Sequence, residues 1–142
     1  MTQNSLEICF TPAAFEAHAD SEAVVVIIDV LRATSSICTA FANGVREIIP
    51  VETVEEARAM KARGYLVAAE RDGYELDFAD FGNSPFDYKP EIVAGKEVVF
   101  TTTNGTMAIE MGQESKHLFI GTFSNIDALA DKCMESSERI VV

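Results

Sequence analysis

Short apolar runs alternate with stretches of helical spacing along most of the chain. The clearest run, 24–28, is made of five β-branched residues and predicts a strand buried on both faces that reaches Asp29. Similar runs predict the remaining strands at 6–10, 47–51, 65–69, 96–103, 118–121 and 139–142.

Helices are predicted between these strands from apolar spacing and from start and stop signals. Thr53 and Glu56 form a capping-box pattern for a helix over 54–63, and Gly64 ends it. The other helices are predicted at 13–18, 35–42, 107–113 and 126–134. Strands that alternate with helices predict an α/β fold, with a largely parallel sheet and helices on both faces.

The stretch 73–89 is the least regular part of the chain. It is rich in aromatic and acidic residues, and a loop of this length in a small domain is more often functional than a passive connection. The sequence stops inside its last apolar run, although a buried strand usually needs further chain to pack against. We therefore expect residues 1–142 to form a single α/β domain that is the N-terminal part of a longer chain.

Composition narrows the classes of partner. The 142 residues carry 11 Lys and Arg against 23 Asp and Glu, so the formal net charge is −12. Because nucleic-acid affinity depends on basic side chains that neutralise phosphates, this balance argues against a nucleic-acid partner. The sequence shows neither a signal-peptide pattern nor an apolar run of the roughly 20 residues that cross a bilayer. We expect a cytoplasmic protein without a membrane partner, and the acidic domain is compatible with a homo-oligomer.

The cysteines and histidines show no metal-ligand spacing. Cys9, Cys38 and Cys133 are far apart, which favours structural thiols in a reducing compartment over a disulfide framework or a zinc site. His18 and His117 likewise have no partner at ligand spacing, so neither is expected to bind a metal.

Polar side chains recur where three of the predicted strands end. Asp29 and Arg32 follow the second strand, Glu70 and Arg71 follow the fourth, and the polar run 102–106 ends the fifth. The carboxyl ends of parallel strands lie on one rim of a sheet, where open α/β sheets bind ligands. We therefore expect these groups to converge on one ligand.

These residue types suit an anionic ligand. The guanidinium of Arg32 or Arg71 can donate two parallel hydrogen bonds to a phosphate or a sulfonate, and helix N-termini offer backbone N–H groups to the same oxygens. Mg²⁺ is usually held by one or two carboxylates together with substrate oxygens and water, a role that fits Asp29 and Glu70.

Each of these residues also has a plainer interpretation. Asp29 alone is compatible with a helix cap or a turn, and Arg32 and Arg71 with solvated or paired side chains. The sequence lacks the phosphate-binding patterns GxxxxGK[ST] and GxGxxG. Phosphatases of the haloacid-dehalogenase type normally carry a second Asp two residues after the first, where this chain has Leu31. The repetition of one polar set at three strand ends is what favours a functional site.

Four motifs in the same order resemble the 2-phosphosulfolactate phosphatase family of coenzyme M biosynthesis: IDVLRAT at 28–34, ERDG at 70–73, FGNSP at 81–85 and TTTNGT at 101–106. The resemblance implies a Mg²⁺-dependent hydrolase that converts 2-phospho-3-sulfolactate to 3-sulfolactate and phosphate. It also implies a Gly-rich, acidic second part that this sequence does not contain. The site residues that it implies are Asp29, Arg32 and Glu70 as catalytic residues, Asp29 and Glu70 as Mg²⁺ ligands, and Arg71, Asn83, Ser84, Thr103, Asn104 and Gly105 as substrate-binding residues.

The leading hypothesis is a phosphatase that acts on a small phosphorylated anion. The sequence leaves open whether Asp29 attacks phosphorus or only holds a metal that activates water. One alternative is a phosphatase of another small phosphorylated hydroxy acid. Another is a non-catalytic α/β domain that binds an anion without cleaving it, and a third is an assembly or folding unit whose site needs a further segment.

Overall fold

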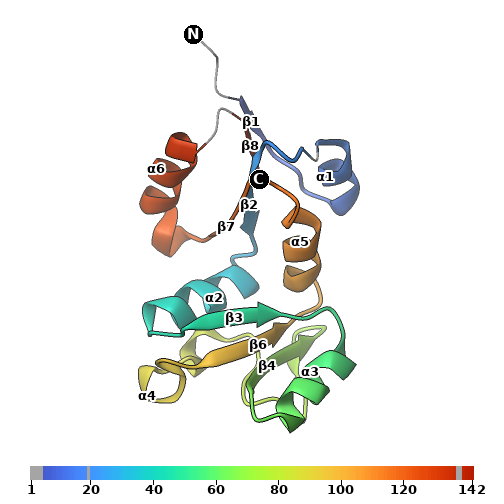
Figure 1. The fold of residues 1–142 in the computed structure, drawn as a ribbon, viewed down its shortest axis with the longest axis vertical. Helices are drawn as coiled ribbons and strands as arrows, with labels where there is room; N and C mark the ends of the chain where they lie inside the picture. Colours follow the sequence, from blue (N-terminus) through green and yellow to red (C-terminus); the bar gives the residue numbers. More distant parts are fainter. Residues whose placement is uncertain (1–4, 19, 137–138) are drawn as a thin grey trace.

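The computed structural model describes residues 5–18, 20–136 and 139–142, and in this part of the chain eight strands alternate with six α-helices (Figure 1). The strands form two separate four-stranded sheets. The segment that builds the second sheet is inserted between two neighbouring strands of the first. The chain therefore leaves the first sheet after β2 and returns to it at β7.

The first sheet is entirely parallel, in the order β1-β8-β2-β7. Strand β2 pairs with β7 along its whole length, from Val24 opposite His117 to Ile28 opposite Gly121. Its strands are β1 (Ser5–Glu7), β2 (Val24–Ile28), β7 (His117–Gly121) and β8 (Arg139–Val141).

The second sheet has the order β3-β6-β4-β5, and only β5 runs antiparallel. A tight turn at Asp72 and Gly73 joins β4 to β5, and both residues have positive φ angles, +53° and +86°. Asp-Gly is the dipeptide that such hairpin turns favour. The strands are β3 (Glu47–Pro50), β4 (Leu66–Arg71), β5 (Tyr74–Glu75) and β6 (Glu97–Thr101).

Six helices and two short 3₁₀ turns connect the strands of the described chain. The capping box predicted at Thr53 and Glu56 is present at the start of α3. No helix among the described residues is long and apolar enough to cross a membrane. The helices are α1 (Pro12–His18), α2 (Ala33–Ala42), α3 (Val54–Ala62), α4 (Pro90–Val93), α5 (Gly105–Gly112) and α6 (Ile126–Ser136), with short 3₁₀ turns η1 (Pro85–Asp87) and η2 (Phe123–Asn125).

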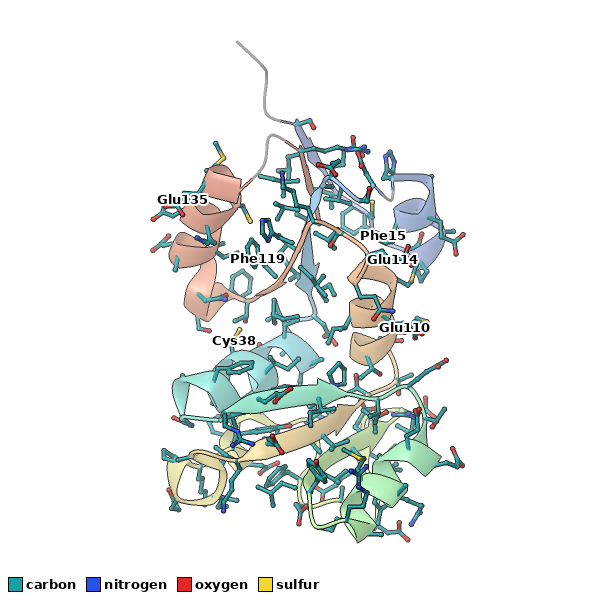
Figure 2. The ribbon with its side chains drawn as sticks, viewed as in Figure 1. Phe15, Cys38, Glu110, Glu114, Phe119 and Glu135 are labelled. Atoms are coloured by element: carbon teal, nitrogen blue, oxygen red, sulfur yellow. The ribbon has the colours of Figure 1, made fainter. Side chains whose placement is uncertain are left out.

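Both faces of the first sheet are covered by helices. Successive residues of β2 point to opposite faces. Val24 and Val26 pack with Cys133 of α6, and Val25 and Ile27 pack with residues of α1 and α5. Figure 2 shows the two sides of this core through Phe119, which lies toward α6, and Phe15 on the side of α1.

The second sheet is covered in the same way. Phe100 of β6 faces the start of α2, where it packs with Ala33 and Ile37, and Val99 faces Ala57 of α3. Helix α2 therefore starts at the end of a strand in one sheet and covers the face of the other. This places α2 and α5 between the two sheets (Figure 1).

The predicted α/β class, with parallel strands and helices on both faces, is confirmed. The division of the strands between two sheets is the main difference from the expectation of one sheet, because strand partners are set by contacts between distant parts of the chain. The stretch 73–89 is irregular as predicted, apart from β5 and η1. The short helix α4, which has Pro90 in its first turn, was not predicted from the sequence.

Candidate active site

A cleft of about 240 Å³ lies between the two sheets, where β2, β4 and β6 end. Strand β2 belongs to the first sheet, whereas β4 and β6 belong to the second. The polar groups that were predicted on the rim of one sheet therefore come from the rims of two sheets that face each other across the cleft. The lining residues are Asp29, Leu31, Arg32, Glu70, Asp72, Gly73, Asn83, Thr102, Thr103 and Asn104.

Asp29 is positioned by its backbone. Its N–H donates to Thr34 Oγ1 at 3.0 Å, and its carbonyl oxygen accepts from the Thr34 N–H at 3.0 Å. These two bonds tie the end of β2 to the first turn of α2. The Asp29 carboxylate has no hydrogen bond or ion pair with any other described residue, so both of its oxygens are available to a ligand.

Glu70 is held by the β4–β5 hairpin and by the end of β6. Its side chain is largely buried, and Oε1 accepts from the Gly73 N–H at 2.5 Å and from Thr103 Oγ1 at 3.2 Å. Thr103 Oγ1 in turn accepts from the Asp72 N–H at 2.9 Å. These hydrogen bonds fix the orientation of the Glu70 carboxylate. The Oε2 atom makes no hydrogen bond within the described chain.

Arg32 reaches the same hairpin from the other sheet. Its Nη2 donates to the carbonyl oxygen of Gly73 at 3.3 Å, which leaves most of its five N–H donors available. It is also the residue immediately before α2, and its side chain caps no amide of the helix. A guanidinium beside two carboxylates gives the cleft one strong anion-binding group.

The N-termini of α2 and α5 meet at the cleft. Gly105 is the first residue of α5, and a Cβ atom there would lie 2.6 Å from the Cβ of Ala33, the first residue of α2. Asn104, which precedes α5, makes no capping hydrogen bond with its side chain. N–H groups in the first turn of a helix bind anions, and the helix dipole favours negative charge there. Two such ends on one cleft make it suitable for phosphate.

Asn83 lines the cleft, and its side-chain oxygen is buried without a hydrogen-bond partner among the described residues. The side chain is 5% exposed, and Oδ1 is the one buried side-chain atom without a hydrogen-bond partner among the described residues. The backbone around it is fixed, because Ser36 Oγ donates to the Asn83 carbonyl at 2.9 Å and Tyr88 donates to that of Gly82 at 3.2 Å. Burial raises the pKa of Tyr88, so its hydroxyl stays a donor. A buried unpaired amide oxygen in a native fold calls for a partner.

Three of the predicted site residues lie outside the cleft lining. Arg71 points away, and its guanidinium donates to Thr101 Oγ1 at 2.8 Å and to the carbonyl oxygens of Glu70 and Glu52 at 2.6 and 3.2 Å. Ser84 precedes the η1 turn, and Gly105 packs behind the lining. The geometry therefore gives Arg71 a positioning contact between β4 and β6.

The cleft offers oxygen donors of the kind that Mg²⁺ prefers. Asp29 and Glu70 contribute carboxylates with free oxygens, and Asn83 contributes the unpaired amide oxygen. Among the described residues, no group of three or more His, Cys, Asp or Glu side chains is placed to hold a metal. Mg²⁺ does not require one, because it usually keeps several waters and takes further oxygens from a phosphorylated substrate. The residues fit that ion.

Three lining residues were not assigned to the site from the sequence: Leu31, Asp72 and Gly73. Thr102 lines the cleft as part of the polar run 102–106 that was expected there. The dipeptide Asp72-Gly73 is a sequence signal that could have identified two of the three unassigned residues, because Asp-Gly predicts a hairpin turn close to the end of the strand that carries Glu70. Leu31 is 88% exposed and gives the cleft an apolar edge that no sequence pattern marks.

Comparison with known proteins places this cleft in a family. The family model described as 2-phosphosulpholactate phosphatase matches residues 9–142. The chain belongs to the 2-phosphosulpholactate phosphatase family. The resemblance found in the four motifs is thus confirmed, and the family match covers all three strand ends that build the cleft.

Individual relatives agree with the family assignment. A protein of Clostridium acetobutylicum named as a probable 2-phosphosulfolactate phosphatase is 42% identical over 120 residues, 82% of this chain and 51% of the relative. Proteins with the same name from Thermotoga petrophila and Clostridium perfringens are 43% and 42% identical, over 82% and 88% of this chain and 51% and 54% of the relative. The chain spans about half the length of the curated relatives that it matches.

Proposed function

We propose that the chain provides the active-site cleft of a phosphatase that hydrolyses 2-phospho-3-sulfolactate to 3-sulfolactate and phosphate. Membership in the 2-phosphosulpholactate phosphatase family supports 2-phospho-3-sulfolactate as the substrate. The observation that carries the proposal is the convergence of Asp29, Arg32 and Glu70 on one cleft with the N-termini of α2 and α5. The same substrate implies a role in coenzyme M biosynthesis.

In this proposal, the side chains divide the two tasks of binding and catalysis. The free N–H donors of Arg32 bind the phosphate oxygens, where negative charge accumulates during phosphoryl transfer. The dipole of α5 adds positive potential at the cleft, although the Gly105 N–H itself donates to Thr102 Oγ1 at 3.0 Å. The reaction breaks the bond between phosphorus and the C2 oxygen. Water supplies a hydroxyl group to phosphorus and a proton to the departing oxygen. Thr103 keeps the Glu70 carboxylate oriented toward the cleft through its hydrogen bond to Oε1.

Mg²⁺ is part of the proposal, held by Asp29 and Glu70 with the Asn83 amide oxygen as a further donor. When bound, the ion would neutralise phosphate charge and polarise the phosphoryl group. Asn83 is suited to this position because its oxygen is buried and lacks a partner among the described residues.

The test is phosphate release from 2-phospho-3-sulfolactate with and without Mg²⁺, followed by ³¹P NMR. Asp29→Asn removes a free carboxylate in the cleft and should reduce the rate at least a hundredfold. Asp77→Asn is the matched control, because it makes the same chemical change on an exposed side chain that pairs with Arg58 outside the cleft. The control should keep the wild-type rate.

Two outcomes would change the assignment. Saturable binding of the substrate without release under any divalent ion would favour a non-catalytic anion-binding domain. Normal Mg²⁺-dependent turnover by Asp29→Asn would remove Asp29 from its central role. Acid quenching during turnover separates the two chemical routes, because protein-bound phosphate forms only if the carboxylate attacks phosphorus.

A further inference from the structure

A second and larger cleft, of about 500 Å³, opens at the opposite end of the strands of the second sheet, where these strands begin. Its lining comes from the residues at which β3, β4 and β6 begin, including Arg46, Tyr65 and Lys96. The candidate active site lies where β4 and β6 end. At about 3.3 Å per residue, the six residues of β4 put about 16 Å between the two ends of that strand. The two clefts therefore share strands and no lining residue.

The charge of this cleft is opposite to that of the protein. Three basic residues, Arg46, Arg63 and Lys96, line it with a single acidic residue, Glu97. Glu97 pairs with Arg46. This gives a local formal charge of +2 in a chain of net charge −12 that has only 11 Lys and Arg in total. Clefts lined by one sign of charge concentrate ligands of the other sign.

Two of these cations are available to a ligand. Arg63 lies over the ring of Tyr65, 5.6 Å from its centroid, and donates to Met60 Sδ at 3.2 Å. Neither Arg63 nor Lys96 has a carboxylate partner among the described residues, although 23 acidic residues are present in the chain. This cleft therefore has two basic lining residues whose charge no carboxylate of the described chain neutralises.

The backbone leaves the cleft open. Gly64 and Gly95 end the turns that follow α3 and α4, and both have positive φ angles, +92° and +71°. A Cβ atom added at either position would meet nothing within 4 Å. The turns therefore require glycine for their φ angles, and two positions of the cleft lining carry no side chain.

A different explanation for a basic residue is a helix C-terminus, where positive charge interacts favourably with the helix dipole. Arg63 is the C-cap residue of α3. That explanation does not extend to the whole set. Lys61 already occupies the last turn of α3, and Arg46 and Lys96 each immediately precede a strand. Their common feature is the cleft.

We propose that this cleft binds a small anion with at least two negative charges, such as an organic phosphate or a polycarboxylate, independently of the candidate active site. Arg63 and Lys96 supply the positive charge, and Tyr65 holds the Arg63 guanidinium in place by stacking. Because the groups are exposed, the affinity should fall steeply with salt.

The experiment is a titration of the ¹⁵N-labelled 142-residue chain with inorganic pyrophosphate, in low salt and without divalent ions, followed by ¹H–¹⁵N correlation spectra. Gly64, Gly95 and Lys96 report on this cleft, and Gly73 and Gly105 on the other. We expect saturable shifts at the first set. The double variant Arg63→Gln/Lys96→Gln should raise the dissociation constant at least tenfold there and leave the response at Gly73 and Gly105 unchanged.

The matched control removes the same charge elsewhere. Arg58→Gln/Lys116→Gln lies outside both clefts and should change the dissociation constant less than twofold. An equal loss in both double variants would mean unspecific charge attraction and would overturn the proposal. So would an absence of saturable shifts at Gly64 and Gly95. Shifts that follow protein concentration instead of pyrophosphate would identify the acidic surface of a second copy as the occupant, which also overturns it.

Discussion

Gly105→Ala tests the close approach of α2 and α5 that builds the candidate active site. The added Cβ would lie 2.6 Å from the Ala33 Cβ and 2.8 Å from Thr102 Oγ1, both shorter than real carbon contacts. The Ala33 Cβ is fixed to the backbone, so relief requires α2 or α5 to move. Gly105 has no positive φ angle, so the constraint is the contact alone.

The expected magnitude is the balance of two opposing effects. Overpacking of this kind costs about 1–3 kcal/mol. Replacement of glycine by alanine in a helix returns up to about 1 kcal/mol through helix propensity. We expect a net loss of about 1–2 kcal/mol in the free energy of unfolding, or roughly 3–8 °C in melting temperature. Movement of the helix N-termini should also reduce phosphate release at least tenfold.

Gly112→Ala on the same helix is the matched control. Its Cβ would meet Leu118 Cδ1 at 2.7 Å, which is the flexible end of a side chain and can shift, and Val25 Cγ1 at 3.1 Å, which requires an adjustment of only a few tenths of an ångström. We expect a smaller loss of stability and near-normal phosphate release. Urea denaturation followed by circular dichroism measures the first quantity, and ³¹P NMR the second. A Gly105→Ala variant with unchanged or increased stability would refute the convergence of the two helices.

Three further predictions concern the rest of the fold. Thr53→Ala removes the cap of α3 and should cost about 1 kcal/mol in urea denaturation, whereas Thr53→Ser should cost little. Arg71→Gln should lower the free energy of unfolding by about 1–3 kcal/mol and leave the KM for the phosphorylated substrate within twofold, because its guanidinium bonds protein oxygens; a tenfold rise in KM would restore its predicted substrate-binding role. The Glu22 N–H and then Arg139 lower the pKa of Asp20, so its contribution to stability is present above the unfolded carboxyl pKa and is lost as the pH falls through the folded value. Asp20→Asn should therefore flatten the loss of stability on acidification; an unchanged slope in denaturation at several pH values would contradict this.

The local features of the fold could be predicted from the sequence because they depend on neighbouring residues. The capping box at Thr53 and the buried strand ending near Asp29 are of this kind. Strand partners are not, since β2 lies beside β7, nearly a hundred residues later, and no local pattern encodes that pairing. The division into two sheets could not be predicted for the same reason.

Local sequence patterns also do not determine which single side chains face the candidate active site. Glu70 and Arg71 both follow an apolar strand, and the sequence alone gave both a role in the site. Successive residues on a strand point to opposite faces, so only one of them could line the cleft. The structure selects Glu70 and turns Arg71 toward Thr101. Strand alternation could have raised this conflict, but the face that borders the cleft is set by the tertiary fold.

The insertion of the second sheet between β2 and β7 has a mechanical consequence. The described chain crosses between the two sheets at two segments, 29–32 on the way out and 102–104 on the way back. Both segments line the cleft. A rotation of one sheet against the other would therefore move the walls of the cleft, and it would also have to break the contact between Ser35 Oγ of α2 and Thr122 Oγ1 after β7, which are 3.0 Å apart. Substrate that bridges Arg32 and Thr103 would link the two crossing segments and resist that rotation.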